Sequence, residues 1–122
     1  MSKRRVLIVE DDPDIAALVA RYVEKDGLYA DVMTTGDDAL AAIKAHAPDL
    51  VVLDVMLPNV NGIEICRVLK SDDQTAHIPI LMMTAHLDDT SRSIRDHGAD
   101  EYLAKPFSPK ELLACIRTLL GT

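Results

Sequence analysis

Acidic, hydroxyl and amino side chains stand at or near the ends of four separate apolar segments of this chain. They are Glu10, Asp11, Asp54, Thr84 and Lys105. In an α/β sheet, ligands bind at the carboxyl ends of the parallel strands. If these segments are parallel strands, the five side chains are expected to lie around one site.

These residue types suit phosphoryl transfer to a carboxylate. Carboxylates that converge in a partly desolvated pocket repel each other until one protonates or a cation binds, and oxygen-only ligands favour Mg²⁺. A carboxylate beside Mg²⁺ can attack phosphorus and form an aspartyl phosphate. Lys105 would offset charge on the phosphoryl oxygens, and Thr84 would donate a hydrogen bond to them. Asp54 is the candidate acceptor.

Each of these residues also has a purely structural interpretation. Asp12 can cap a helix that has Pro13 at its first position, which is a more ordinary role than binding metal. Thr84 alone could cap a following helix, Lys105 alone could be a surface lysine, and Asp54 alone could be a turn residue. The coincidence of these groups at strand ends favours a shared function.

Apolar runs alternate with helical patterns along the chain. Strands are predicted at residues 6–9, 29–33, 50–53, 78–83 and 101–104. Helices are predicted at residues 13–26, 35–46, 63–70, 87–97 and 109–120. Five alternating βα units predict an α/β fold, a parallel sheet with helices on both faces.

Composition narrows the function classes. The 122 residues, 48% of them hydrophobic, fit one domain covering residues 1–122. A net charge of -7 argues against direct nucleic-acid binding by this chain. The apolar run at residues 6–9 is too short for a signal peptide, and no run approaches a membrane span. Together with two cysteines expected to stay reduced, these features predict a cytoplasmic protein without a membrane partner.

Four motifs resemble the signature of bacterial two-component response-regulator receiver domains. They are Val9-Glu10-Asp11-Asp12, Leu53-Asp54-Val55-Met56-Leu57-Pro58 with Gly62, Met83-Thr84-Ala85, and Lys105-Pro106-Phe107. The resemblance covers essentially the whole chain. It implies a flavodoxin-like (βα)5 three-layer sandwich whose five-stranded parallel sheet has the order 2-1-3-4-5.

The resemblance also implies residue roles. Asp54 matches the phosphorylation site. The Mg²⁺ ligands would be Glu10 (through water), Asp11, Asp54 and the backbone carbonyl of Met56. The phosphate-binding and switch positions would be Thr84, Ala85, Tyr102 and Lys105. Met56 and His86 match two positions that tune the lifetime of the phosphoryl group, and the bond before Pro106 is expected to be cis.

The implied function is signalling through phosphorylation. The donor would be a phosphohistidine on a sensor histidine kinase or a histidine phosphotransfer protein. The domain would not be an enzyme in the usual sense, although slow self-dephosphorylation is expected. Its switch face, made by the fourth helix, fifth strand and fifth helix, would control an unknown output protein or an attached effector domain.

The segment from Lys105 onward is similar to receivers attached to winged-helix DNA-binding domains, which pair through that face. Asp100 and Glu101 fit such a charged interface. Cys115 replaces the arginine usual there, which removes a salt-bridge partner and argues against this mode of pairing. A stand-alone regulator and a piece of a longer one have the same sequence features.

Two other function classes compete with this interpretation. A Mg²⁺-dependent phosphatase with an aspartyl nucleophile would carry a second aspartate two residues after the first, where this chain has Met56. An FMN-binding flavodoxin would need a phosphate-binding loop after the first strand, and the acidic segment at residues 10–12 would repel a phosphate. One Phe and no Trp also offer little to stack on a flavin.

Overall fold

The computed structural model describes residues 4–57, 60–84 and 98–121. Its strands are β1 (Arg5–Val9), β2 (Tyr29–Met33), β3 (Leu50–Asp54), β4 (Ile80–Thr84) and β5 (Glu101–Ala104). Its helices are α1 (Pro13–Lys25), α2 (Ala39–His46), α3 (Gly62–Ser71) and α5 (Pro109–Leu120). The helix predicted at residues 87–97 lies outside the described residues, as do Pro58, Ala85 and His86.

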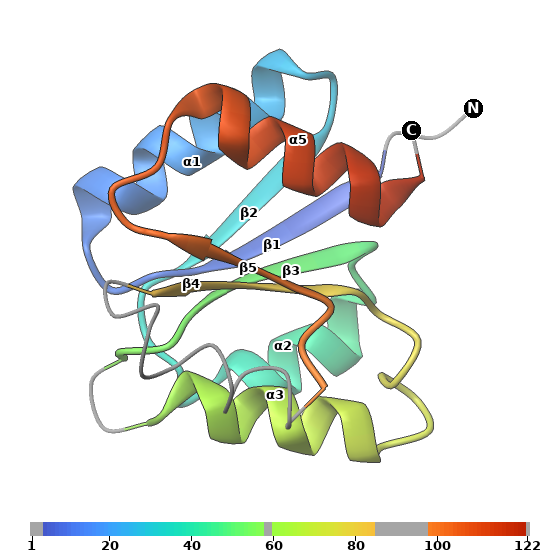
Figure 1. Ribbon diagram of the computed structural model, residues 1–122. Helices are drawn as coiled ribbons and strands as arrows, with labels where there is room; N and C mark the ends of the chain where they lie inside the picture. The colour runs from blue at the N-terminus through green and yellow to red at the C-terminus, as the bar shows by residue number, and fades with distance from the viewer. Residues whose placement is uncertain (1–3, 58–59, 85–97, 122) are drawn as a thin grey trace.

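The strands form one parallel sheet in the order β2-β1-β3-β4-β5. Helices α1 and α5 cover one face of this sheet, and α2 and α3 cover the other (Figure 1). The predicted α/β class, the three layers and the strand order are therefore confirmed.

Two hydrophobic cores lie on opposite faces of the sheet, and each strand contributes alternate residues to both. Leu7, Val51 and Met82 belong to the core under α2 and α3. Ile8 and Val52 belong to the core under α1 and α5. Strands buried on both faces require continuous apolar runs, which explains why β1, β3 and β4 were recognisable from sequence.

Helix caps follow the local sequence. The Asp12 carboxylate accepts hydrogen bonds from the backbone N–H groups of Asp14 and Ile15, at 2.9 and 3.4 Å, and so begins α1. Ser108 and Glu111 form the predicted capping box of α5. The expected cap role of Asp12 is confirmed.

Two predicted boundaries differ from the structure by two or more residues, and the other differences are of one residue. Helix α2 begins at Ala39 instead of residue 35, because Gly36 is buried in a turn against side chains of Leu57, Val60 and Ile65. Strand β4 begins at Ile80 instead of residue 78. Pro79 has no N–H for the ladder, and Ile78 donates its own N–H to the Thr75 carbonyl instead.

No helix in the described parts of the chain combines the length and apolar character that crossing a membrane requires.

Candidate functional site

The sheet brings three charged side chains from distant parts of the chain to its carboxyl edge. Glu10 follows β1, Asp54 ends β3 and Lys105 follows β5. Glu10 is fully buried, Asp54 is 4% exposed, and the Lys105 side chain is 18% exposed. Charges this deeply buried normally require partners, which the site supplies.

Lys105 joins the two buried carboxylates. Its Nζ lies 2.6 Å from Glu10 Oε1 and 3.0 Å from Asp54 Oδ2. The other oxygen of Asp54, Oδ1, accepts a hydrogen bond of 3.1 Å from the backbone N–H of Met56. Glu10 Oε2 accepts a longer one, at 3.3 Å, from the N–H of Asp12. Asp54 is thereby held in one orientation by groups on both of its oxygens.

One ammonium group does not balance the carboxylates around it. Burial, and after it the hydrogen bond with Asp54, raise the pKa of Glu10 from 4.5 to about 7, because Lys105 opposes these two effects only in part. For Lys105, burial acts to lower the pKa, but the hydrogen bonds to Glu10 and Asp54 outweigh it and raise the pKa. The pocket therefore favours an added positive charge, whether a proton or a cation.

A third carboxylate completes a group with metal-binding geometry. Oxygen atoms of Glu10, Asp11 and Asp54 all lie within 4.8 Å of one another, and Asp11 is exposed to solvent. An all-oxygen set at the mouth of a negatively charged pocket has the chemistry that a hard cation such as Mg²⁺ prefers. The residues present fit that ion.

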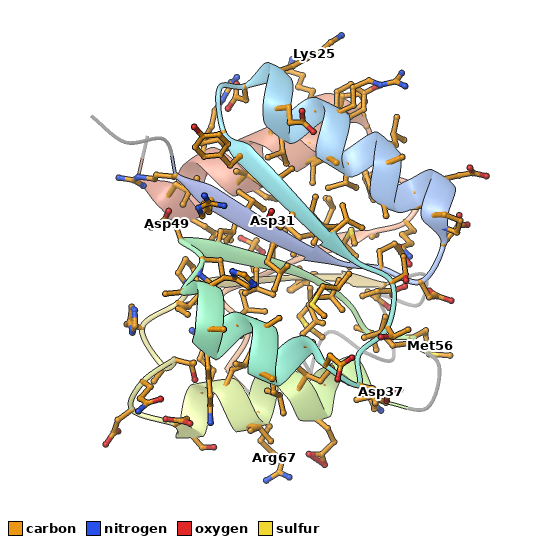
Figure 2. All side chains as sticks on the ribbon, turned by 180° about the vertical axis from the view of Figure 1, so that it is seen from behind. Lys25, Asp31, Asp37, Asp49, Met56 and Arg67 are labelled. Atoms are coloured by element: carbon orange, nitrogen blue, oxygen red, sulfur yellow. The ribbon has the colours of Figure 1, made fainter. Side chains whose placement is uncertain are left out.

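Met56 lies beside this group. The residue is 67% exposed, and its side chain extends away from the body of the protein (Figure 2). Its backbone carbonyl as a metal ligand, and the influence of Met56 on phosphoryl lifetime, stay predictions. His86 and Ala85 are outside the described residues, so the roles expected for them also stay predictions.

The two switch candidates lie on adjacent strands. Thr84 is buried at the end of β4, where the Lys105 backbone N–H donates to its carbonyl oxygen at 2.8 Å. Tyr102 lies on β5, is half-buried and packs against the core under α2 and α3. The peptide bond between Lys105 and Pro106 is cis.

Gly62 has a role at the site that sequence reasoning did not assign. Its N–H donates to the Val55 carbonyl at 2.9 Å, and a Cβ built on it would overlap the Asp54 carbonyl oxygen and lie 2.9 Å from Val55 Cα. Only glycine allows the start of α3 to pack this closely behind Asp54. The motif match included Gly62, but nothing in the sequence pattern indicated this backbone contact.

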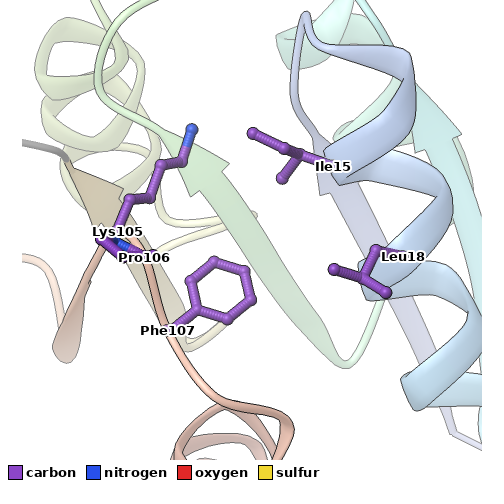
Figure 3. Close-up of a pocket in the computed structure, with 5 residues that line it drawn as sticks. All are labelled: Ile15, Leu18, Lys105, Pro106 and Phe107. Atoms are coloured by element: carbon purple, nitrogen blue, oxygen red, sulfur yellow. The ribbon is translucent and has the colours of Figure 1, made fainter.

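An apolar pocket of about 370 Å³ adjoins the charged site. Ile15 and Leu18 of α1 lie on one side of it, and Lys105, Pro106 and Phe107 lie on the other (Figure 3). Leu18 is 41% exposed. Helical periodicity assigns Leu18 to the apolar face of α1, but it does not reveal where a neighbouring loop leaves that face open.

The chain is similar to known proteins in sequence and in fold. The response regulator receiver domain model matches residues 6–117. The DNA-binding response regulator MtrA of Mycolicibacterium smegmatis is 42% identical over 119 residues, which are 97% of this chain and 51% of that protein. This chain spans about half the length of the curated relatives it matches.

Solved structures of response regulators have a similar fold. A putative response regulator from Chloroflexus aurantiacus superposes with a TM-score of 0.93 at 32% identity, over 99% of this chain and 100% of that one. The receiver domain of sensor histidine kinase PA1611 from Pseudomonas aeruginosa PAO1, determined with a magnesium ion in its active site cleft, has a TM-score of 0.90. This superposition covers 99% of this chain and 100% of that one. At 23% identity, it shows a similarity of fold alone. With its fold, its carboxyl-edge cluster and these matches, the chain belongs to the response regulator receiver domain family.

Proposed function

We propose that Asp54 accepts a phosphoryl group, in a Mg²⁺-dependent reaction, from a phosphohistidine on a sensor histidine kinase or a histidine phosphotransfer protein. One observation carries this proposal. Asp54 is a buried carboxylate oriented by the Met56 N–H and Lys105 Nζ, within 4.8 Å of oxygens from two further carboxylates. A carboxylate so placed serves as a nucleophile when the repulsion around it is offset.

In the reaction, a carboxylate oxygen of Asp54 forms a bond to phosphorus as the bond from phosphorus to the histidine nitrogen breaks. The imidazole leaves with the electron pair of that bond and is protonated. Lys105 already contacts both Glu10 and Asp54, so its ammonium group needs to move little to contact the oxygens of the transferred phosphoryl group. Mg²⁺ held by Glu10, Asp11 and Asp54 would neutralise charge on the phosphoryl group.

The apolar pocket beside the site is where the phosphoryl donor docks in this proposal. Lys105 lines the pocket and also contacts Asp54, so a partner seated between Ile15 and Phe107 is adjacent to the acceptor. Contact with an apolar pocket supplies binding energy that is independent of the phosphoryl group. A kinase or phosphotransfer helix with apolar residues around its histidine fits this surface.

The output follows from β4 and β5. Thr84 changes position when the phosphoryl group is present, and Tyr102 changes position in turn. These movements alter the surface around β5 and α5. The target is an output protein or an attached effector domain, and with a net charge of -7 this chain itself does not bind nucleic acid directly. Slow hydrolysis of the aspartyl phosphate returns the domain to its resting state.

Mass spectrometry of the intact protein tests the acceptor. Acetyl phosphate with Mg²⁺ is expected to add about 80 Da, the mass of one phosphoryl group. Asp54→Asn should abolish the addition, whereas Asp49→Asn, directly before the opposite end of β3, should retain it. Labelling that persists in Asp54→Asn would show that another residue is the acceptor.

Calorimetric titration with Mg²⁺ tests the metal site. Asp11 is exposed, so Asp11→Asn is expected to fold normally and to bind Mg²⁺ much more weakly. Asp12→Asn is the matched control, because asparagine also caps helices and Asp12 is assigned to α1. If Asp11→Asn binds Mg²⁺ as wild type does, Asp11 is not a ligand.

A further inference from the structure

A second lysine, Lys70, lies at the amino end of the same sheet in a cluster that the proposed reaction does not use. Its Nζ is 2.8 Å from Asp100 Oδ2, and it donates hydrogen bonds to the carbonyls of Ala76 at 3.2 Å and Ile78 at 2.8 Å. The side chain is 18% exposed. We call Lys70 and Asp100 with these acceptors the Lys70 clamp.

Asp100 fixes the register of β5 against β4. Its backbone N–H donates to the Ile80 carbonyl at 3.0 Å, and the Ile80 N–H donates to its Oδ2 at 2.8 Å. This pair of bonds closes the ladder one residue before the paired strands, whose register begins at Leu81 opposite Glu101. The sequence pattern of Asp100 fits a charged interface between receivers, and the structure shows in addition that its carboxylate makes contacts within the chain.

Lys70 holds this junction from α3. Its side chain packs under Gly98, where a Cβ would lie 3.0 Å from Lys70 Cγ and 3.3 Å from its Cβ. Gly98 also has a positive φ of +94°. The segment leading into β5 begins beside α3 (Figure 1), so the clamp joins α3, the start of β4 and the start of β5.

The far end of β5 carries the functional lysine. β5 spans four residues at the edge of the sheet, with β4 as its strand neighbour, and Lys105 follows it directly. A slip of one residue turns every side chain of a strand to the opposite face. A short edge strand has few bonds of its own to prevent such a slip, so its end anchors matter more than in a central strand.

Asp49, before β3, offers a comparison with Asp100, before β5. Asp49 precedes β3 and makes the same two bonds to Arg5, with its N–H donating at 2.8 Å and its Oδ2 accepting at 2.7 Å. β3 is held by strands on both sides. Among the described residues, the ion pair from α3 is found at Asp100 and no ion pair is found at Asp49. The additional anchor therefore accompanies the edge strand that carries Lys105.

We propose that Lys70 and Asp100 are positioning residues for phosphorylation, which hold Lys105 in place against Asp54 through the register of β5. The inference rests on the proposed function of Asp54. The Mg²⁺ ligands follow β1 or end β3, so loosening β5 should leave them in place. The proposal therefore predicts slower phosphorylation with unchanged Mg²⁺ affinity, which a general loss of structure would not produce.

The test measures the rate of labelling by acetyl phosphate and the Mg²⁺ affinity of the same variants. Lys70→Met keeps the stem under Gly98 and removes the ammonium group. Asp100→Ala removes the acceptor for Ile80 and the ion pair, whereas Asp100→Asn can restore the acceptor. We expect labelling to slow about tenfold in Lys70→Met and Asp100→Ala, by analogy with other misplaced catalytic groups. Asp100→Asn should be intermediate.

Matched controls separate positioning from the loss of an ion pair. Lys44 and Asp72 form a similar pair at 2.9 Å, linking α2 to the end of α3 without reaching β5. Lys44→Met and Asp49→Ala should label at the wild-type rate. Circular dichroism and thermal unfolding establish that each variant is folded at the assay temperature, and Lys70→Met decides the outcome if Asp100→Ala does not fold.

The outcomes are distinct. Slow labelling with wild-type Mg²⁺ affinity, confined to the Lys70 clamp, supports the proposal. Wild-type labelling rates in folded Lys70→Met, or a parallel loss of Mg²⁺ affinity, overturn it and leave the role of Asp54 intact. Failure of the wild-type protein to label overturns the role of Asp54 together with this proposal.

Discussion

Two lysines at opposite ends of one sheet show how the same kind of ion pair can have different consequences. Lys105 and Lys70 have equally exposed side chains, at 18%, and each contacts a carboxylate within 3.0 Å. Lys105 contacts two buried carboxylates, near the exposed carboxylate of Asp11. Lys70 contacts one carboxylate, Asp100, and two backbone carbonyls.

The difference lies in the charge balance. At the Lys70 clamp, one positive charge meets one negative charge and neutral acceptors, so the cluster is complete without any added ion. At the carboxyl edge, negative charges outnumber the lysine, and burial together with the neighbouring Asp54 carboxylate raises the pKa of Glu10. A charge excess maintained in a buried place costs stability, and the proposed binding of a cation and a phosphoryl group would give it a function.

The largest effect is expected from Lys105→Met measured without metal. Glu10 and Asp54 would then share a buried pocket with no positive charge, which should cost about 3 kcal/mol of unfolding free energy at pH 8 in EDTA. Saturating Mg²⁺ should restore most of the loss, and Lys110→Met, at an exposed position, should have little effect. Urea unfolding with and without Mg²⁺ measures this. A loss that Mg²⁺ does not reduce would contradict the charge-excess interpretation.

Glu10→Gln should stabilise the metal-free protein. The pKa of Glu10 rises from 4.5 to about 7 on folding, so the folded state binds this proton more tightly than the unfolded state. The wild type therefore loses stability as the pH rises from about 4.5 to about 7. Glutamine lacks that loss, and the variant should be more stable by on the order of 2 kcal/mol at pH 8 in EDTA, with little difference near pH 4.5.

Thermal or urea unfolding across this pH range measures the effect, and Glu24→Gln at an exposed position of α1 is the control. With saturating Mg²⁺ the wild type should be the more stable of the two proteins, because the Glu10 carboxylate binds Mg²⁺ better than the amide of glutamine does. A variant that is no more stable than the wild type at pH 8 in EDTA would show that Glu10 is not under electrostatic strain.

Much of the carboxyl-edge site was predictable from sequence, because it follows from strand ends. Glu10 and Asp54 directly follow apolar runs that could only be buried strands, and parallel strands bring their ends together. The contact between Lys105 and Glu10 was not predicted, since 95 residues separate them and no pattern encodes the direction of a lysine side chain. The packing of Gly62 behind Asp54 was not predicted either, because it is a contact between backbone atoms that residue types do not reveal.

The Lys70 clamp was harder to recognise. Lys70 was assigned only to the last turn of a helix, and Asp100 to a charged interface, because both residues have polar side chains near the surface. Their pairing depends on how the loop after α3 brings Ala76 and Ile78 under the lysine. Two of the partners of Lys70 are backbone carbonyls, which every residue has. The sequence therefore cannot distinguish this cluster from solvated charges.

Lys70→Met should have a smaller effect on stability than either change at the carboxyl edge. It removes one ion pair and two hydrogen bonds but leaves Asp100 bonded to Ile80, so a loss of about 1 to 2 kcal/mol is expected. Because the clamp is balanced, the loss should be equal in EDTA and in Mg²⁺, and urea unfolding in both buffers measures it. A strong dependence on Mg²⁺ would mean that the two lysine clusters are energetically coupled.

The smallest effect is expected at an ion pair that is exposed. Arg67 contacts Glu64 at 2.6 Å on α3, both side chains are more than half exposed, and Arg67 points away from the sheet (Figure 2). Solvent screens such a pair, so Arg67→Ala should change the unfolding free energy by less than about 0.5 kcal/mol, with or without Mg²⁺. Its contact is as short as that of Lys105 with Glu10. A loss as large as that of Lys105→Met would therefore mean that distance, and not burial and charge balance, separates these clusters.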